Sequence, residues 1–146
     1  MSSDAAVVHV IDDDEAVRQS TAFLLRAANI QVQTYETATD FLEALSQVKP
    51  GCIVTDVRMP GLSGIELLQR LRAMKFSMPV IVITGHGDVP LAVEAMKAGA
   101  MDFIEKPFSD DVLLGAVRAA LSVHATDSER QALNAEVNSR IASLSN

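Results

Sequence analysis

This 146-residue chain has one cysteine, no tryptophan and no basic run. The single cysteine, Cys52, has no partner for a disulfide within the chain, which fits a reducing compartment. A chain of this length buries about two-thirds of the surface that its unfolded form exposes, so it needs no disulfide or structural metal to fold. Its composition, 49% hydrophobic and 21% charged, is typical of one ordinary globular domain.

Long apolar segments are also missing. No run approaches the roughly 20 residues that span a bilayer, and Met1 to Asp4 has neither the basic nor the apolar part of a signal peptide. We therefore expect a cytoplasmic protein with no membrane partner. The formal net charge of −7 should repel nucleic acid, so we expect this segment itself to bind none.

Short apolar segments of strand length alternate with segments of helical periodicity. The expected strands are Val7–Ile11, Val32–Tyr35, Cys52–Thr55, Val80–Thr84 and Met101–Glu105. Two of the stripes typical of a packed helix face are Phe41, Leu42, Leu45 and Val48, and Val89, Val93 and Met96. Consecutive βα units predict an α/β, flavodoxin-like parallel sheet of order 2-1-3-4-5, with a site at the carboxyl edge of its strands.

Residues 125–146 differ from the rest of the chain. Their apolar residues form a narrow stripe, closer to a coiled-coil seam than to a core-facing surface: Leu133, Val137, Ile141 and Leu144. We interpret them as a C-terminal helical extension that links the first 124 residues to a second domain. A C-terminal helix that packs on the body is the alternative.

Polar residues stand where the expected strands end. Asp12 and Asp13 follow the first strand, Asp56 ends the third, and Thr84 and Lys106 follow the fourth and fifth. Crowded carboxylates take up protons unless a cation balances them, and Mg²⁺ binds well to carboxylate oxygens. Taken singly, each residue has an ordinary explanation, such as a helix N-cap for the first two. Asp14 or Asp13 could cap that helix in addition to any role at the site. Their joint placement on neighbouring strand ends favours a site.

The set resembles the receiver domain of bacterial two-component response regulators. The residues that carry the resemblance are the acidic pair, the Thr-Asp-Val-Arg-Met-Pro-Gly segment at 55–61, Thr84 and Lys106-Pro107-Phe108, and it covers about residues 7–124. The segment 82–108 is further similar to the FixJ-type subgroup. The resemblance implies a (βα)5 receiver domain at 1–124, and a 125–146 linker toward a C-terminal helix-turn-helix DNA-binding domain that is missing from this chain.

The resemblance also implies the chemistry. Asp56 would accept a phosphoryl group from a phosphohistidine of a sensor histidine kinase, which forms an acyl phosphate. Asp13, Asp56 and the backbone carbonyl of Arg58 would bind Mg²⁺ directly, and Asp12 would bind it through a water molecule. Lys106 would supply an ammonium group to the phosphoryl oxygens. Such a protein is a switch that catalyses at most its own phosphorylation and dephosphorylation.

The remaining implied roles concern the signal. Thr84 would bind the phosphoryl group and, with Phe103, switch conformation, and Pro107 would follow a cis peptide bond. Residues of about 88–105 would then form a homodimer. Arg58 and His86 would tune hydrolysis of the acyl phosphate.

Other classes of protein match less well. Gly85-His86-Gly87 lacks the third glycine of a dinucleotide fingerprint. The three histidines are scattered along the chain, which argues against a transition-metal site, and we expect His9 and His124 at the surface or at core edges. A haloacid-dehalogenase-like phosphatase needs a second aspartate where this chain has Arg58. Among receivers, the alternative to a transcription factor is a stand-alone protein that binds another protein or acts as a phosphate sink.

Overall fold

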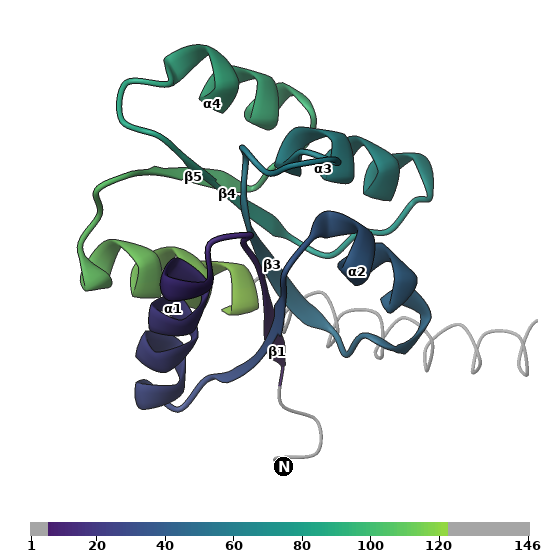
Figure 1. The fold of residues 1–146 in the computed structure, drawn as a ribbon. Helices are drawn as coiled ribbons and strands as arrows, with labels where there is room; N and C mark the ends of the chain where they lie inside the picture. The colour runs from purple at the N-terminus through teal and green to yellow at the C-terminus, as the bar shows by residue number, and fades with distance from the viewer. Residues whose placement is uncertain (1–5, 123–146) are drawn as a thin grey trace, which may run out of the picture.

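The computed structural model describes residues 6–122, and these form three layers around a parallel sheet (Figure 1). The strand order is β2-β1-β3-β4-β5. The strands are β1 (Val7–Ile11), β2 (Gln31–Tyr35), β3 (Gly51–Asp56), β4 (Val80–Thr84) and β5 (Asp102–Glu105). The predicted order is confirmed, and each strand lies within one residue of its predicted bounds. The predicted 125–146 helix and His124 lie outside the described residues.

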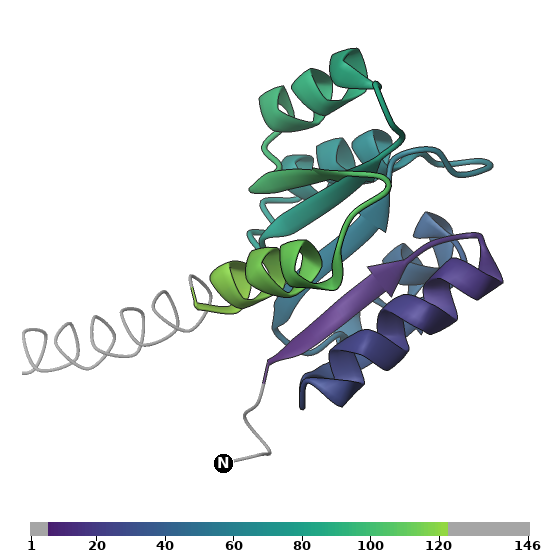
Figure 2. The same cartoon turned by 90° about the vertical axis from the view of Figure 1, so that its left-hand side faces the viewer.

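Helices cover both faces of the sheet. They are α1 (Glu15–Ala27), α2 (Ala38–Glu43), the 3-10 turn η2 (Leu45–Gln47), α3 (Gly64–Ala73), α4 (Val89–Lys97) and a further helix at residues 110–122. Figures 1 and 2 show α1 and the 110–122 helix on one face and the other helices on the opposite face. Two separate apolar clusters fill the spaces between these layers. The central strands β1 and β4 are buried along their whole length, which explains their nearly continuous apolar sequence.

The helix predicted by the stripe from Phe41 to Val48 is shorter than expected. α2 ends at Glu43, and the Ala44 N–H donates to the carbonyls of both Asp40 and Phe41, at 3.2 and 3.1 Å. Such shared bonds tighten the last turn of a helix, and here the chain continues as the 3-10 turn η2.

The stripe of Val89, Val93 and Met96 does not pack on the core as its periodicity suggested. Val93 and Met96 are 45% and 42% exposed, whereas Ala92 and Ala95 are the buried residues of α4. The small alanine side chains face the sheet, so the larger apolar residues lie on the outer side of the helix. The exposed apolar surface of α4 is therefore a feature that sequence periodicity misassigned.

His9 lies in the core, not at the surface or core edge that its sequence suggested. Its Nε2–H donates to the Lys49 carbonyl at 2.7 Å, so its Nδ1 accepts from the Tyr35 hydroxyl at 3.0 Å. The ring also packs edge-on against Phe41. Both ring nitrogens are thus occupied by protein groups, and burial lowers the pKa of His9.

This buried histidine predicts a loss of stability at acidic pH. Because the folded-state pKa lies below the unfolded value of 6.5, unfolding takes up a proton once the pH falls below about 6.5. The free energy of unfolding should fall by up to about 1.4 kcal/mol per pH unit until the folded pKa is reached. Urea unfolding between pH 7.5 and 5 measures this slope.

His9→Gln should flatten that pH dependence, because glutamine offers one donor and one acceptor without titrating. The matched control is His86→Gln, which removes an exposed histidine and should keep the wild-type slope. An unchanged slope in His9→Gln would contradict the assignment.

Candidate functional site

Three carboxylates converge at the carboxyl edge of the sheet. β1 and β3 are parallel neighbours with Ile11 opposite Thr55, so the residues that follow them come together. Carboxylate oxygens of Asp12, Asp13 and Asp56 lie within 4.8 Å of one another. This group makes the acidic pocket that the sequence indicated, and carboxylate oxygens at this spacing fit a hard divalent cation such as Mg²⁺.

Asp12 is held rigidly within this pocket. Its Oδ1 accepts the Asp14 N–H at 2.9 Å, and its backbone carbonyl accepts Arg18 Nη1 at 2.7 Å. Burial raises the pKa of Asp12, and the charges of Asp56 and Asp13 raise it further, while the Asp14 N–H and Lys106 oppose them. The capping role belongs to Asp14, which accepts Val17 N–H at 3.1 Å as the N-cap of α1. Asp12 and Asp13 are therefore not the N-cap.

Asp56 and Lys106 form an ion pair across the site. Lys106 Nζ lies 3.3 Å from Asp56 Oδ2, and both side chains are partly shielded from solvent. Thr84 is buried at the end of β4, and its carbonyl accepts the Lys106 N–H at 2.9 Å. The Lys106–Pro107 peptide bond is cis. Three adjacent strands thus supply the carboxylate, the hydroxyl and the ammonium group.

The loop after Asp56 packs closely on the start of α3. The Arg58 N–H points to Asp56 Oδ1 at 3.4 Å, and the Gly64 N–H donates to the Val57 carbonyl at 2.9 Å. A Cβ atom on Gly64 would lie 2.4 Å from the Asp56 carbonyl oxygen, so only glycine fits there. This packing fixes the backbone that carries Asp56 and Arg58.

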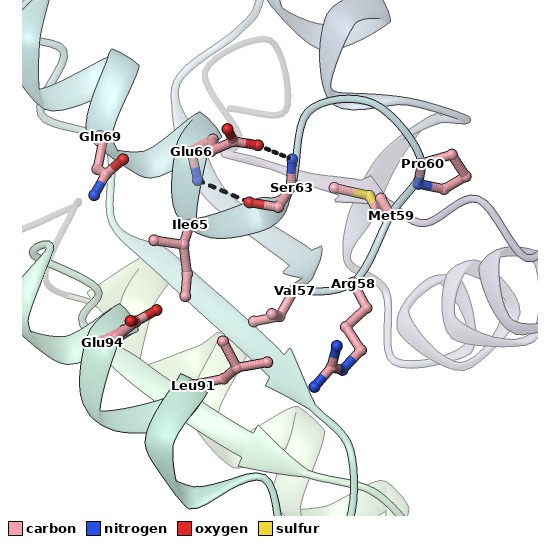
Figure 3. Close-up of a pocket in the computed structure, with 10 residues that line it drawn as sticks. All are labelled: Val57, Arg58, Met59, Pro60, Ser63, Ile65, Glu66, Gln69, Leu91 and Glu94. Atoms are coloured by element: carbon pink, nitrogen blue, oxygen red, sulfur yellow. Dashed lines mark hydrogen bonds between the residues drawn. The ribbon is translucent and has the colours of Figure 1, made fainter.

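A cavity of about 660 Å³ lies between this loop, α3 and α4, and Figure 3 shows the residues that line it. Val57, Ile65 and Leu91 lie around it, and the Ser63–Glu66 capping box forms part of its border. The Arg58 side chain extends from the loop toward the N-terminal end of α4. The cavity lies next to the acidic pocket, but Asp12, Asp13 and Asp56 are not among the residues that line it.

A second cavity, of about 440 Å³, lies on the surface of α4 and β5. Thr84 borders it, together with Val93, Met96 and Phe103. Phe103 is 41% exposed, so its ring belongs to the surface. Thr84, at the end of β4, therefore borders an exposed apolar surface formed by α4 and β5.

Two residues at the site, Asp88 and Glu105, were missed by sequence reasoning. Asp88 pairs with Arg58, and Glu105 accepts the Gly87 N–H and lies 3.8 Å from His86 Nδ1. Asp88 follows Gly85-His86-Gly87 and Glu105 precedes Lys106-Pro107-Phe108, but nothing in the sequence indicated the partner of either acid.

The fold and this set of strand-end residues are those of a receiver domain, and comparison with known proteins agrees. The family described as response regulator receiver domain matches residues 8–118. The chain is 56% identical over 138 residues to the transcriptional regulatory protein FixJ of Azorhizobium caulinodans, covering 94% of this chain and 65% of that protein. The chain therefore belongs to the response regulator receiver domain family.

Solved structures give the same result. The crystal structure of FixJ-N is 52% identical with a TM-score of 0.78, and covers 80% of this chain and 94% of that one. Full-length FixJ from B. japonicum is 48% identical with a TM-score of 0.80, and covers 96% of this chain and 69% of that one. The chain spans about two-thirds of the length of these full FixJ proteins. No helix among residues 6–122 is long and apolar enough to cross a membrane.

The acidic pocket predicts that Mg²⁺ stabilises the folded domain. A cation that binds only the folded state at ten times its dissociation constant adds about 1.4 kcal/mol to the free energy of unfolding. Thermal unfolding with and without Mg²⁺ measures this gain.

Asp12→Asn should lose part of the Mg²⁺ gain and stabilise the metal-free domain, because it removes a buried, repelled carboxylate. The control is Glu43→Gln, which removes an exposed charge on α2 and should retain the full gain. A full Mg²⁺ gain in Asp12→Asn would contradict the assignment of the pocket.

Proposed function

We propose that this chain is a receiver that is activated when Asp56 accepts a phosphoryl group from a phosphohistidine of a sensor histidine kinase. The observation that carries the proposal is the convergence of Asp12, Asp13 and Asp56 within 4.8 Å, with Lys106 Nζ 3.3 Å from the acceptor carboxylate. Carboxylates held this close are costly without a cation and a ligand. A phosphoryl group with Mg²⁺ accounts for both the acids and the lysine.

The donors around Asp56 suit an in-line phosphoryl transfer. An Asp56 oxygen attacks phosphorus as the phosphorus–nitrogen bond of the phosphohistidine breaks, and the electron pair of that bond stays on the imidazole. Lys106 and Thr84 stabilise the negative charge on the phosphoryl oxygens. Mg²⁺, held by Asp13, Asp56 and the Arg58 carbonyl, with Asp12 through water, would supply charge neutralisation.

The phosphoryl group then changes a surface. It adds about −1.5 to −2 charges and three acceptor oxygens beside Thr84, and this hydroxyl moves toward them. The space it leaves admits the ring of Phe103, which lacks a hydroxyl group and therefore signals by its shape. The phosphoryl group thereby biases an equilibrium between two conformations of α4 and β5.

The exposed apolar surface of α4 and β5 suits a homodimer. Val93, Met96 and Phe103 gather around the second cavity, where a second copy would cover them. An apolar surface of this kind marks an interaction site. Phosphorylation would thus promote dimerisation through residues of about 88–105.

The output of the switch is proposed to be transcription. The relative from Azorhizobium caulinodans is a transcriptional regulatory protein, and this chain covers 65% of its length. We assign residues 1–124 to the receiver and 125–146 to a linker toward a DNA-binding domain. In this proposal the protein works in the cytoplasm, and its catalysis is limited to its own phosphorylation and dephosphorylation.

Phosphorylation is tested with acetyl phosphate and Mg²⁺. Intact-mass spectrometry should show a gain of one phosphoryl group, which Asp56→Asn should abolish because its amide is not a nucleophile. The matched control, Asp40→Asn, removes an acid on α2 and should be phosphorylated like the wild type. A wild-type chain that never gains the group would refute the proposal.

Dimerisation is tested on the same phosphorylated protein. Val93→Glu places a charge in the proposed interface, so the dimer dissociation constant should rise at least about tenfold. Sedimentation with and without acetyl phosphate measures this constant. Phe23→Glu, an equally drastic change on the exposed surface of α1, is the control and should dimerise normally. Equal weakening by both substitutions would argue against the α4 and β5 surface.

A further inference from the structure

An ion pair joins the phospho-acceptor loop to the start of α4. Arg58 Nε and Nη2 both donate to Asp88 Oδ2, at 3.1 and 3.0 Å. The Arg58 side chain is 73% exposed and that of Asp88 only 17%. The acid is therefore the fixed member of the pair, and the guanidinium is the member that can move.

Asp88 is used differently from the residues that begin the other helices. The side chains of Asp14, Thr37 and Ser63 each accept a backbone N–H as N-caps of α1, α2 and α3. Asp88 is the N-cap of α4, and aspartate is a preferred cap residue, yet its side chain makes no cap bond. Its carboxylate is committed to Arg58 instead.

The loop that carries Asp88 is held from its other side. Glu105, at the end of β5, accepts the Gly87 N–H and lies 3.8 Å from His86 Nδ1. The Asp88 N–H also donates to the Gly85 carbonyl at 3.1 Å. These bonds fix the position of Asp88, so this residue cannot follow Arg58 toward another anion.

The backbone of Arg58 lies beside the acceptor carboxylate. It lies two residues after Asp56, and its backbone N–H is 3.4 Å from Asp56 Oδ1. A guanidinium presents a planar set of donors that matches phosphoryl oxygens, and arginine side chains stabilise the transition state of phosphoryl transfer. Once Asp56 reacts, two anions compete for the same guanidinium.

We propose that Asp88 is a positioning residue that withholds the Arg58 guanidinium from the phosphoryl group on Asp56. The inference rests on the proposed phosphorylation of Asp56. The Asp88 carboxylate holds the Arg58 side chain toward α4. Phosphoryl transfer therefore proceeds with less stabilisation of the transition state by the guanidinium than Arg58 could provide. Asp88 thereby slows both the gain and the loss of the phosphoryl group.

Both steps pass through a phosphoryl group with negative charge on its oxygens. In the first, an Asp56 oxygen bonds to phosphorus while the donor's bond to phosphorus breaks, and the donor leaves with the electron pair. In the second, a water oxygen bonds to phosphorus, Asp56 leaves as a carboxylate, and the water releases a proton to solvent. A freed guanidinium stabilises both transition states.

The experiment compares Asp88→Asn with the wild type. The phosphorylation rate is measured with acetyl phosphate and Mg²⁺, and the dephosphorylation rate after removal of the donor, both by intact mass. Exposed ion pairs are weak, so both rates should rise only about two- to fivefold. Asp88→Glu, which keeps a carboxylate, should stay near the wild type.

The decisive control is the same substitution in an Arg58→Met background, where Asp88→Asn should change neither rate. Glu94→Gln removes an exposed charge from the same helix and should match the wild type. Thermal unfolding verifies that each variant is folded. If Asp88→Asn is not folded, Asp88→Ser replaces it, because serine is also a preferred residue at a helix N-cap.

Each result decides the inference. Slower rates in Asp88→Asn would mean that Asp88 holds Arg58 in a position that assists phosphoryl transfer. Equal changes with and without Arg58 would mean that Asp88 has only a structural role. Either result overturns the inference. If the wild type is phosphorylated and the variant has the same rates, the inference alone fails. If the wild type gains no phosphoryl group, the proposed function fails as well.

Discussion

Repulsion among three carboxylates at one edge of the sheet is the constraint on which the rest of the structure depends. Parallel pairing of β1 with β3 brings Asp12, Asp13 and Asp56 within 4.8 Å. The protein keeps them there with the Asp14 N–H on one acid and Lys106 on another. Burial and the charges of the neighbouring acids raise the pKa of Asp12, so a bound cation would relieve the repulsion.

The same edge is connected to a distant surface. Thr84 ends β4, the parallel neighbour of the strand that ends at Asp56, and also borders the cavity of α4 and β5. On the other side of the site, Arg58 reaches Asp88 at the start of α4. Helix α4 turns its alanines inward and its larger apolar residues outward, so a shift of this helix would change the exposed apolar surface.

Sequence patterns predicted the strands closely, most clearly β1, β3 and β4, which are short and mainly apolar segments. They predicted the acidic pocket for a topological reason, since the carboxyl ends of neighbouring parallel strands meet at one edge. They were wrong about α4, where periodicity favoured Val89, Val93 and Met96 for the core and the structure buries Ala92 and Ala95. Small residues carry little weight in a hydrophobic pattern, although they allow a helix to approach a sheet closely.

The sequence by itself determined the order of the elements and the chemical groups at the strand ends, because both follow from local periodicity and parallel pairing. Only the tertiary structure decided which acidic side chain forms an ion pair with which basic side chain. Arg58 and Asp88 are 30 residues apart, and Lys106 and Asp56 are 50 apart. Such partners are set by how loops lie on the packed sheet. The buried bonds of His9 have the same origin, because they depend on Tyr35 and Lys49 from neighbouring strands and loops.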